Sequence, residues 1–284
     1  MRAMKERTQA GSLLSKRFRH VLLHLAEAAR RELDSITTHP VRSVHSLRTR
    51  MKNLLALLPL VKPRIPKPQR KAVANLAGAL KDAFSAQRDT HVLDALRAKV
   101  AGRRKTAPKQ IPTPQSAATN TVAKADASRL IRIISKAGLR GLTWAEVADG
   151  YLQTYRAGRK AMKACERKPS GRAFHKWRRA VKDFFYQSQV LQPLEGMKAR
   201  SRSAGRLSDR LGMLNDLRLL HAESKKSRAP KACKHIAKKQ RALRTPIFKV
   251  AGKLFRERPR EIARELGRCL KFHPAIAAQA VRQT

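Results

Sequence analysis

Two stretches of the sequence place histidine, arginine and lysine at the same helical spacing. In VHSLRTRMKNLLALLPLV, residues 44–61, these residues are His45, Arg48 and Lys52. Arginine donates to phosphate oxygens as a planar fork and lysine as a point charge, so such a row can bind a multivalent anion. The pattern recurs in FHKWRRAVKDFFYQSQVL, residues 174–191, as His175, Arg178, Arg179 and Lys182.

The helix that carries each row also has an apolar face, and the row lies beside that face. At about 100° per residue, His45, Arg48 and Lys52 fall within about 60° of one another. Neither row contains a carboxylate, although a solvent-exposed helix face usually mixes signs to form i,i+4 ion pairs. A solvated cationic face is the structural alternative, but an anion along the row would relieve the repulsion. The inward faces are predicted to hold Val44, Leu47, Met51, Leu54, Leu55 and Leu58, and Phe174, Trp177, Val181, Phe184 and Phe185.

Each row is preceded by another basic helical stretch that opens on an aromatic residue and an arginine. The first is FRHVLLHLAEAARR, with Arg19, and the second is YRAGRKAMKACERK, with Arg156 and Lys160. Lys163 extends the second ladder by one more turn. We therefore add Arg19, Arg156 and Lys160 to the candidate anion-binding residues.

The two halves of the sequence align in two blocks. His45, Arg48 and Lys52 align with His175, Arg178 and Lys182 at one constant offset, and LKDAFSAQRDTHVL aligns with LSDRLGMLNDLRLL at nearly the same offset. This order predicts an internally duplicated helical unit. Asp89 and Asp216 occupy matching places in the second block, each before a new apolar period, and are expected to cap helix N-termini or to form salt bridges.

Apolar periodicity is helical throughout, which predicts an all-α fold. Together with the duplication, it predicts helices in both halves with a linker between them. The whole chain, 1–284, is one domain in this interpretation, with helical halves at 13–101 and 127–272. Prolines and small polar residues at 102–126 predict a linker between them. Within the second half, helices are expected near 143–165, 172–191 and 201–214, another after Asp216, and a last one near 258–272.

The composition indicates a polyanionic partner. The 284 residues include 65 Lys+Arg and 19 Asp+Glu, which gives a net charge of +46. A compact protein with this excess repels itself unless an anion lies nearby. The net charge alone does not distinguish among three polyanionic partners: nucleic acid, anionic membrane and inorganic phosphate polymers. Three scattered cysteines, no secretory signal pattern and no long apolar run predict a cytoplasmic protein without membrane insertion.

With these motifs assembled, the chain resembles the CHAD domain family, the conserved-histidine α-helical domains. The similarity rests on VHSLRTRMKNLL and FHKWRRAVKDFFY, on FSAQRDTHVL and LGMLNDLRLL, and on the C-terminal GKLFRERP. The resemblance implies an all-α fold of two similar antiparallel four-helix units, related by a pseudo-twofold axis, around a basic central groove or pore that binds inorganic polyphosphate. It also implies association with polyphosphate granules. Carried over by motif, it points to His45, Arg48, Lys52, His175, Arg178, Arg179 and Lys182, with less support for Arg19 and Arg156.

Two other functions are kept beside polyphosphate binding. A nucleoid-associated nucleic-acid-binding protein fits the charge, but aromatic residues form only 5% of the chain and are needed in the core, which leaves few stacking platforms. An enzyme is the least supported class, because no Gly-rich phosphate loop is present. His20 and His24 have the spacing of half a metal site but no matching motif, so we predict no metal, no cofactor and no catalytic residue.

Overall fold

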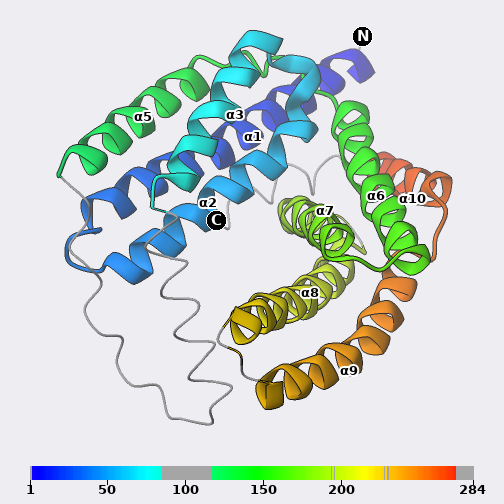
Figure 1. Cartoon of the computed structure of the whole chain (residues 1–284). Coiled ribbons are helices and arrows are strands. Elements are labelled where there is room, and N and C mark those ends of the chain that lie inside the picture. Colours follow the sequence, from blue (N-terminus) through cyan, green and yellow to red (C-terminus); the bar gives the residue numbers. More distant parts are fainter. Residues whose placement is uncertain are drawn as a thin grey trace.

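The computed structural model describes residues 2–84, 117–192, 194, 196–226, 228 and 230–272. Every element in these ranges is a helix, as predicted, and they contain no strand (Figure 1). The predicted helix after Asp89 lies outside the described residues. The helices are α1 (Arg2–Asp34), α2 (Pro40–Val61), the 3-10 turn η1 (Lys62–Arg64), α3 (Lys67–Asp82), α5 (Ala117–Ser135), α6 (Trp144–Arg167), α7 (Gly171–Val190), α8 (Met197–Lys226), α9 (Pro230–Leu254) and α10 (Pro259–Phe272).

The first group of helices consists of α1, α2, α3 and α5. Helix α1 packs on α2 and α5, and α3 packs on α2 and α5 (Figure 1). Helix α5 corrects the predicted linker, because residues 117–126 belong to its first half. Helix α5 contains no proline, and its residues Ala123, Ala127 and Leu130 recur at helical spacing and are buried. The polar composition of the segment concealed that period.

In the second group, α6 packs on α7, α7 packs on α8, and α8 packs on α9, while α10 packs on α6 (Figure 1). Helix α8 is continuous, whereas the sequence predicted two helices with Asp216 as a cap between them. Asp216 lies inside α8, so its predicted capping role is wrong. Asn215 and Asp216 favour caps, but no proline or glycine follows them to interrupt the hydrogen-bond ladder.

Helix α2 joins the two groups by packing on both α6 and α7. Its contact with α6 is close at Gly150, where an added Cβ would lie 2.5 Å from the carbonyl oxygen of Pro59. On the α7 side, the Gln187 side-chain amide donates to the buried carbonyl of Ala56 at 2.7 Å. Glycine at position 150 is therefore required for α2 and α6 to approach this closely.

The predicted inward faces of α2 and α7 form much of the core between the helices. Trp177 is completely buried and stacks on Phe248 of α9 with ring centroids 5.3 Å apart. Leu55 and Phe185 depart from the prediction, since both are only partly buried. Phe185 lies against Gly205 of α8. The side chains whose burial is confirmed are Val44, Leu47, Met51, Leu54, Leu58, Phe174, Trp177, Val181 and Phe184.

Helix α5 packs in the first group, although its residues 127–135 fall within the predicted second half. The structural equivalence of the halves, and hence the internal duplication, stays a prediction.

Candidate functional site

The cationic row on α2 has two accessible members and one structural member. His45 is exposed and Lys52 is half-buried. Arg48 is buried, donates from Nη1 to the carbonyl of Lys81 and lies 3.8 Å from Asp82 Oδ1. Lys81 and Asp82 end α3, where carbonyl groups lack helical partners. Arg48 therefore ties α2 to the end of α3, a role that its spacing in the sequence did not reveal.

Arg19 also has a structural role. Its side chain is half-buried, and Nη2 donates to the carbonyl of Ala137 at 3.0 Å, just beyond the end of α5. This bond links α1 to the turn that leads towards α6.

The row on α7 faces α8 over part of its length. His175 and Arg179 are exposed, whereas Arg178 and Lys182 are half-buried. Helices α7 and α8 pack side by side, and the guanidinium of Arg178 lies across Gly212 of α8. Lys182 Nζ lies 6.0 Å from the ring centroid of Tyr186, one turn further along α7.

The sequence pattern did not predict a role for Arg218 of α8. Its guanidinium packs against Gly171, the first residue of α7, so closely that a Cβ there would lie 1.5 Å from Nη2. The predicted break at Asp216 separated Arg218 from the preceding helix and concealed this position. A glycine at the start of α7 was the only sequence signal that a long side chain could cross there.

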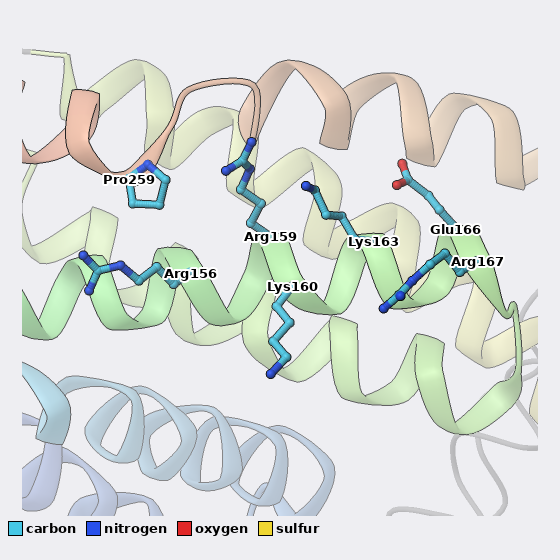
Figure 2. Close-up of a pocket in the computed structure, with 7 residues that line it drawn as sticks. All are labelled: Arg156, Arg159, Lys160, Lys163, Glu166, Arg167 and Pro259. Carbon is cyan, nitrogen blue, oxygen red and sulfur yellow. The ribbon is translucent and has the colours of Figure 1, made fainter.

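Helix α6 places several cations around a hollow. The hollow has a volume of about 680 Å³ and is lined by α6 and by Pro259 at the start of α10 (Figure 2). In Figure 2, Arg159 and Lys163 project from one side of α6 and Lys160 from the other. The sequence had indicated Arg156, Lys160 and Lys163 but not the other lining residues. The complete lining is Arg156, Arg159, Lys160, Lys163, Glu166, Arg167 and Pro259.

The amphipathic pattern of α6 fixes this arrangement. Tyr151, Tyr155 and Cys165 are buried on the face opposite the cations. From position 156 to position 167 the cationic row extends over about 16 Å at 1.5 Å per residue. The row is therefore long enough to contact several groups of an extended polymer.

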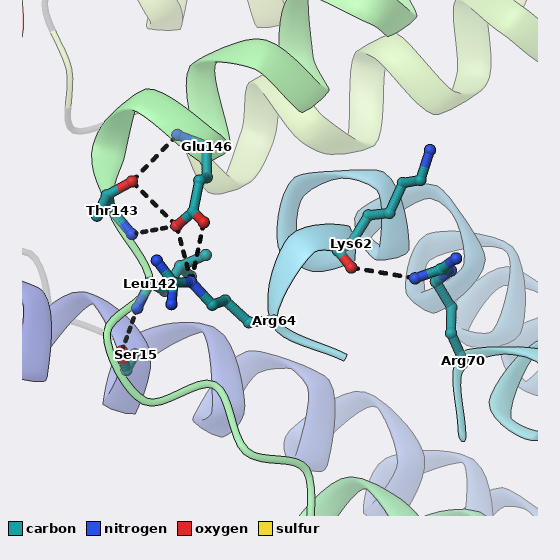
Figure 3. A network of polar contacts seen from close by, with 7 residues as sticks. All are labelled: Ser15, Lys62, Arg64, Arg70, Leu142, Thr143 and Glu146. Carbon is teal, nitrogen blue, oxygen red and sulfur yellow. Dashed lines mark hydrogen bonds and ion pairs between the residues drawn. The ribbon is translucent and has the colours of Figure 1, made fainter. Parts of the chain in front are cut away.

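The N-terminus of α6 is held by a capping box and an ion pair (Figure 3). The Thr143 hydroxyl accepts from the Glu146 backbone N–H, while Glu146 accepts from the Thr143 backbone N–H at 2.8 Å. Arg64 Nε lies 2.9 Å from Glu146 Oε1 and connects the end of η1 to α6. Burial alone would raise the pKa of Glu146, but the hydrogen bonds from Arg64 and Thr143 lower it. The same network anchors the preceding turn, where the Leu142 N–H donates to Ser15 Oγ.

The cations of the hollow are not neutralised by carboxylates of the described residues. No ion pair within those residues includes any of the five cations, and Glu166 is the single carboxylate in the lining. The Nε of Arg159 is buried and has no hydrogen-bond partner among them. By contrast, Arg200 is paired with both Glu257 and Glu265. The hollow thus offers donors and positive charge to an anion.

Among the described residues, no group of three or more histidine, cysteine, aspartate and glutamate side chains is placed to hold a metal ion. Within the same ranges, no helix has the length and apolar character needed to cross a membrane.

Comparison with known proteins identifies the family. The chain is similar to the crystal structure of the CHAD domain from the plant Ricinus communis, with 19% sequence identity and a TM-score of 0.44 over 89% of this chain and 91% of that chain. No curated protein matches the sequence. The family model of the CHAD domain matches residues 12–225, which is most of the chain. The protein therefore belongs to the CHAD domain family.

Proposed function

We propose that this chain binds inorganic polyphosphate through cationic side chains of α6 and α7, and that it acts as a binding protein and not as an enzyme. The observation that carries the proposal is the hollow on α6, in which five cations and one carboxylate surround an open space. The CHAD family assignment supports the same ligand class. We expect the protein to reside in the cytoplasm and, as the resemblance implies, to associate with polyphosphate granules.

The chemistry of the hollow suits a linear phosphate polymer. Polyphosphate presents closely spaced negative charges and acceptor oxygens along one direction, and the cations of α6 follow the helix axis. Arginine forks and lysine ammonium groups both form charge-assisted hydrogen bonds to such oxygens. Because one helix holds the backbone positions of these side chains in a row, only their rotamers must be ordered when the polymer binds.

Nucleic acid is the second candidate, and the net charge of +46 favours it. The aromatic residues argue against recognition of single strands, because Trp177, Phe184 and Phe255 are buried in the core. A base could not stack on them without unfolding the helices. We therefore propose that binding to nucleic acid is nonspecific and weaker than binding to polyphosphate at equal charge.

The α6 hollow can be tested with a pair of charge-neutralising variants. Arg156→Gln with Lys163→Gln removes one arginine and one lysine from the lining, seven positions apart. Arg129→Gln with Lys136→Gln is a matched control at the same spacing, on exposed residues of the α5 region. We expect the first pair to weaken binding of labelled long-chain polyphosphate at least tenfold at 0.15 M salt, which is about 1.4 kcal/mol.

The control pair should change the dissociation constant less than threefold, and circular dichroism should show that both proteins stay folded. Equal weakening by the two pairs would mean that total charge, and not the hollow, determines affinity.

A further inference from the structure

The 255–259 segment, with the sequence FRERP, joins α9 to α10 and lies beside the α6 hollow. It ends at Pro259, which begins α10 and lines the hollow. Figure 2 shows Arg159 projecting from α6 on the side where Pro259 lies. The segment belongs to the GKLFRERP motif, but none of the cations of that motif lines the hollow. The motif therefore contributes a wall to the hollow, and not a cation.

Two contacts hold the 255–259 segment against α6. Phe255 is buried against Gly158, where an added Cβ would lie 2.7 Å from Phe255 Cζ. The Tyr155 hydroxyl donates to the backbone carbonyl of Glu257 at 2.8 Å. Gly158 and Tyr155 are each followed in sequence by an arginine of the hollow. The position of the segment therefore determines how far the wall lies from these two arginines.

On its other side, the segment is held by Arg200 of α8. Arg200 Nη2 donates to Glu257 Oε2 at 2.6 Å and also to Oε2 of Glu265 on α10. Burial disfavours the charge of Arg200, but the hydrogen bond to Glu257 and the charges of both carboxylates outweigh it, so the pKa of Arg200 is raised. Gly196 leaves room for this pairing, since an added Cβ there would lie 2.8 Å from Glu265 Oε1. We call Arg200, Glu257 and Glu265 the α10 clamp.

The two carboxylates of the α10 clamp are unfavourable neighbours for a polyanion. The chain has only 19 Asp+Glu beside 65 Lys+Arg, and the Glu257 side chain is 46% exposed. Its negative charge opposes the approach of an anion to this part of the surface. Any benefit of the two carboxylates to anion binding must therefore come through the structure that they hold.

We infer that Arg200, Glu257 and Glu265 are positioning residues of the polyphosphate site, which hold the 255–259 segment against α6 and thereby shape the hollow. The inference rests on the proposed function and deepens it. None of the three residues lines the hollow, so they act through the wall that ends at Pro259. Release of this wall would widen the hollow and leave the arginine side chains of α6 with more rotamers to order on binding.

The test is a variant for which positioning and simple charge predict opposite results. Glu257→Gln with Glu265→Gln breaks the α10 clamp and raises the net charge of +46 by two. Simple charge predicts tighter binding of labelled long-chain polyphosphate at 0.15 M salt. Positioning predicts binding that is weaker by about fivefold. Unchanged or tighter binding would overturn the inference.

The matched control is Glu27→Gln with Asp209→Asn, which raises the net charge equally at two exposed positions. This control should bind polyphosphate as tightly as the wild type or more tightly. Hydrogen exchange adds a structural readout, because release of the α10 clamp should speed exchange in α10 and leave α2 protected. Unchanged protection of α10 in the clamp variant would contradict the assignment.

A double-mutant cycle shows whether the α10 clamp acts through the hollow. When Arg156→Gln with Lys163→Gln is already present, breaking the clamp should weaken binding by less than about twofold further. Equal weakening with and without these two substitutions would place the effect elsewhere in the molecule and overturn the inference. Absence of polyphosphate binding by the wild type, or no effect of Arg156→Gln with Lys163→Gln, would instead overturn the proposed function.

Arg200→Lys is a second variant that leaves the net charge unchanged. Its ammonium group cannot reproduce the planar geometry of the guanidinium, so the clamp is weakened without removal of a charge. It should weaken polyphosphate binding in the same direction, and it decides the question if the carboxylate variant does not fold. Wild-type affinity of Arg200→Lys, together with faster exchange in α10, would show that the position of the wall does not affect binding.

Discussion

At the residue scale, Asp183 of α7 carries a carboxylate where burial opposes its charge. Burial raises its pKa from 3.8 to about 6, and Arg179 only partly opposes the shift. Since the folded-state pKa lies above the unfolded one, the protonated form stabilises the fold, and this stability is lost as the pH rises from about 4 to about 6.

We predict that Asp183→Asn raises the free energy of unfolding by about 2–3 kcal/mol at pH 7.5, at 1.36 kcal/mol per pKa unit. At pH 4 the variant and the wild type should differ little. Urea unfolding at both pH values measures the difference, with Asp209→Asn as a control at an exposed position of α8. A benefit of equal size at both pH values would show that the carboxylate charge is not its cause.

Arg48 and Arg178 should differ in what they contribute, although they align in the sequence. Arg48→Gln removes the link to Lys81 and Asp82, so it should lower the free energy of unfolding by about 1–3 kcal/mol. Arg178→Gln should mainly weaken polyphosphate binding. Urea unfolding and binding titrations of both variants test this division, which equal effects on stability and affinity would contradict.

At the scale of elements, the approach of α2 and α6 is a packing constraint. Gly150→Ala would place a methyl group 2.5 Å from the Pro59 carbonyl oxygen and 2.9 Å from Leu60 Cα. Backbone atoms cannot move aside as a flexible side chain can, so we predict a loss of about 2 kcal/mol or more in the free energy of unfolding.

The matched control is Gly78→Ala in α3, where nothing lies within 4 Å of an added Cβ. That substitution should stabilise the protein by about 0.5–1 kcal/mol through helix propensity. Thermal unfolding of both variants measures these two changes in stability. A stable Gly150→Ala protein would show that the two helices are not held at this separation.

The helices were predictable from the sequence where a long apolar period is bounded by prolines or by capping residues. Prolines and a capping box bound α2 and α6 within a few residues of their expected limits. The helix predictions failed in two places. In the first half of α5, polar residues obscured the apolar period, and inside α8, Asp216 was wrongly assigned as an N-cap. Helix propensity depends on each residue and its near neighbours in sequence. The helix α5 is instead stabilised by burial against α1 and α3, which propensity does not include.

The candidate site was predictable in part for the same reason. Helical spacing located the rows on α6 and α7, since both depend on neighbours within one helix. Spacing could not show that Arg48 and Arg19 are engaged by carbonyl groups of other helices. It also could not find Arg218, which reaches α7 only through the tertiary pairing of α7 and α8.

At the scale of the whole molecule, the net charge should make binding strongly dependent on salt. By analogy with DNA, six or more phosphate contacts would reduce affinity by on the order of 10³ between 50 and 200 mM salt. We predict that Arg156→Gln with Lys163→Gln lowers the slope of log affinity against log salt by about 1–2. Titrations at four salt concentrations measure the slope, and an unchanged slope would place both residues outside the contact surface.

The measurement that tests the central claim most directly is a competition titration at physiological salt. Labelled long-chain polyphosphate, bound to the full chain, is challenged with unlabelled polyphosphate, duplex DNA, RNA and heparin at matched total charge. The account predicts that only unlabelled polyphosphate displaces the label efficiently. Equal displacement by DNA or RNA would contradict it, because the charge of +46 would then act without regard to the chemistry of the polyanion.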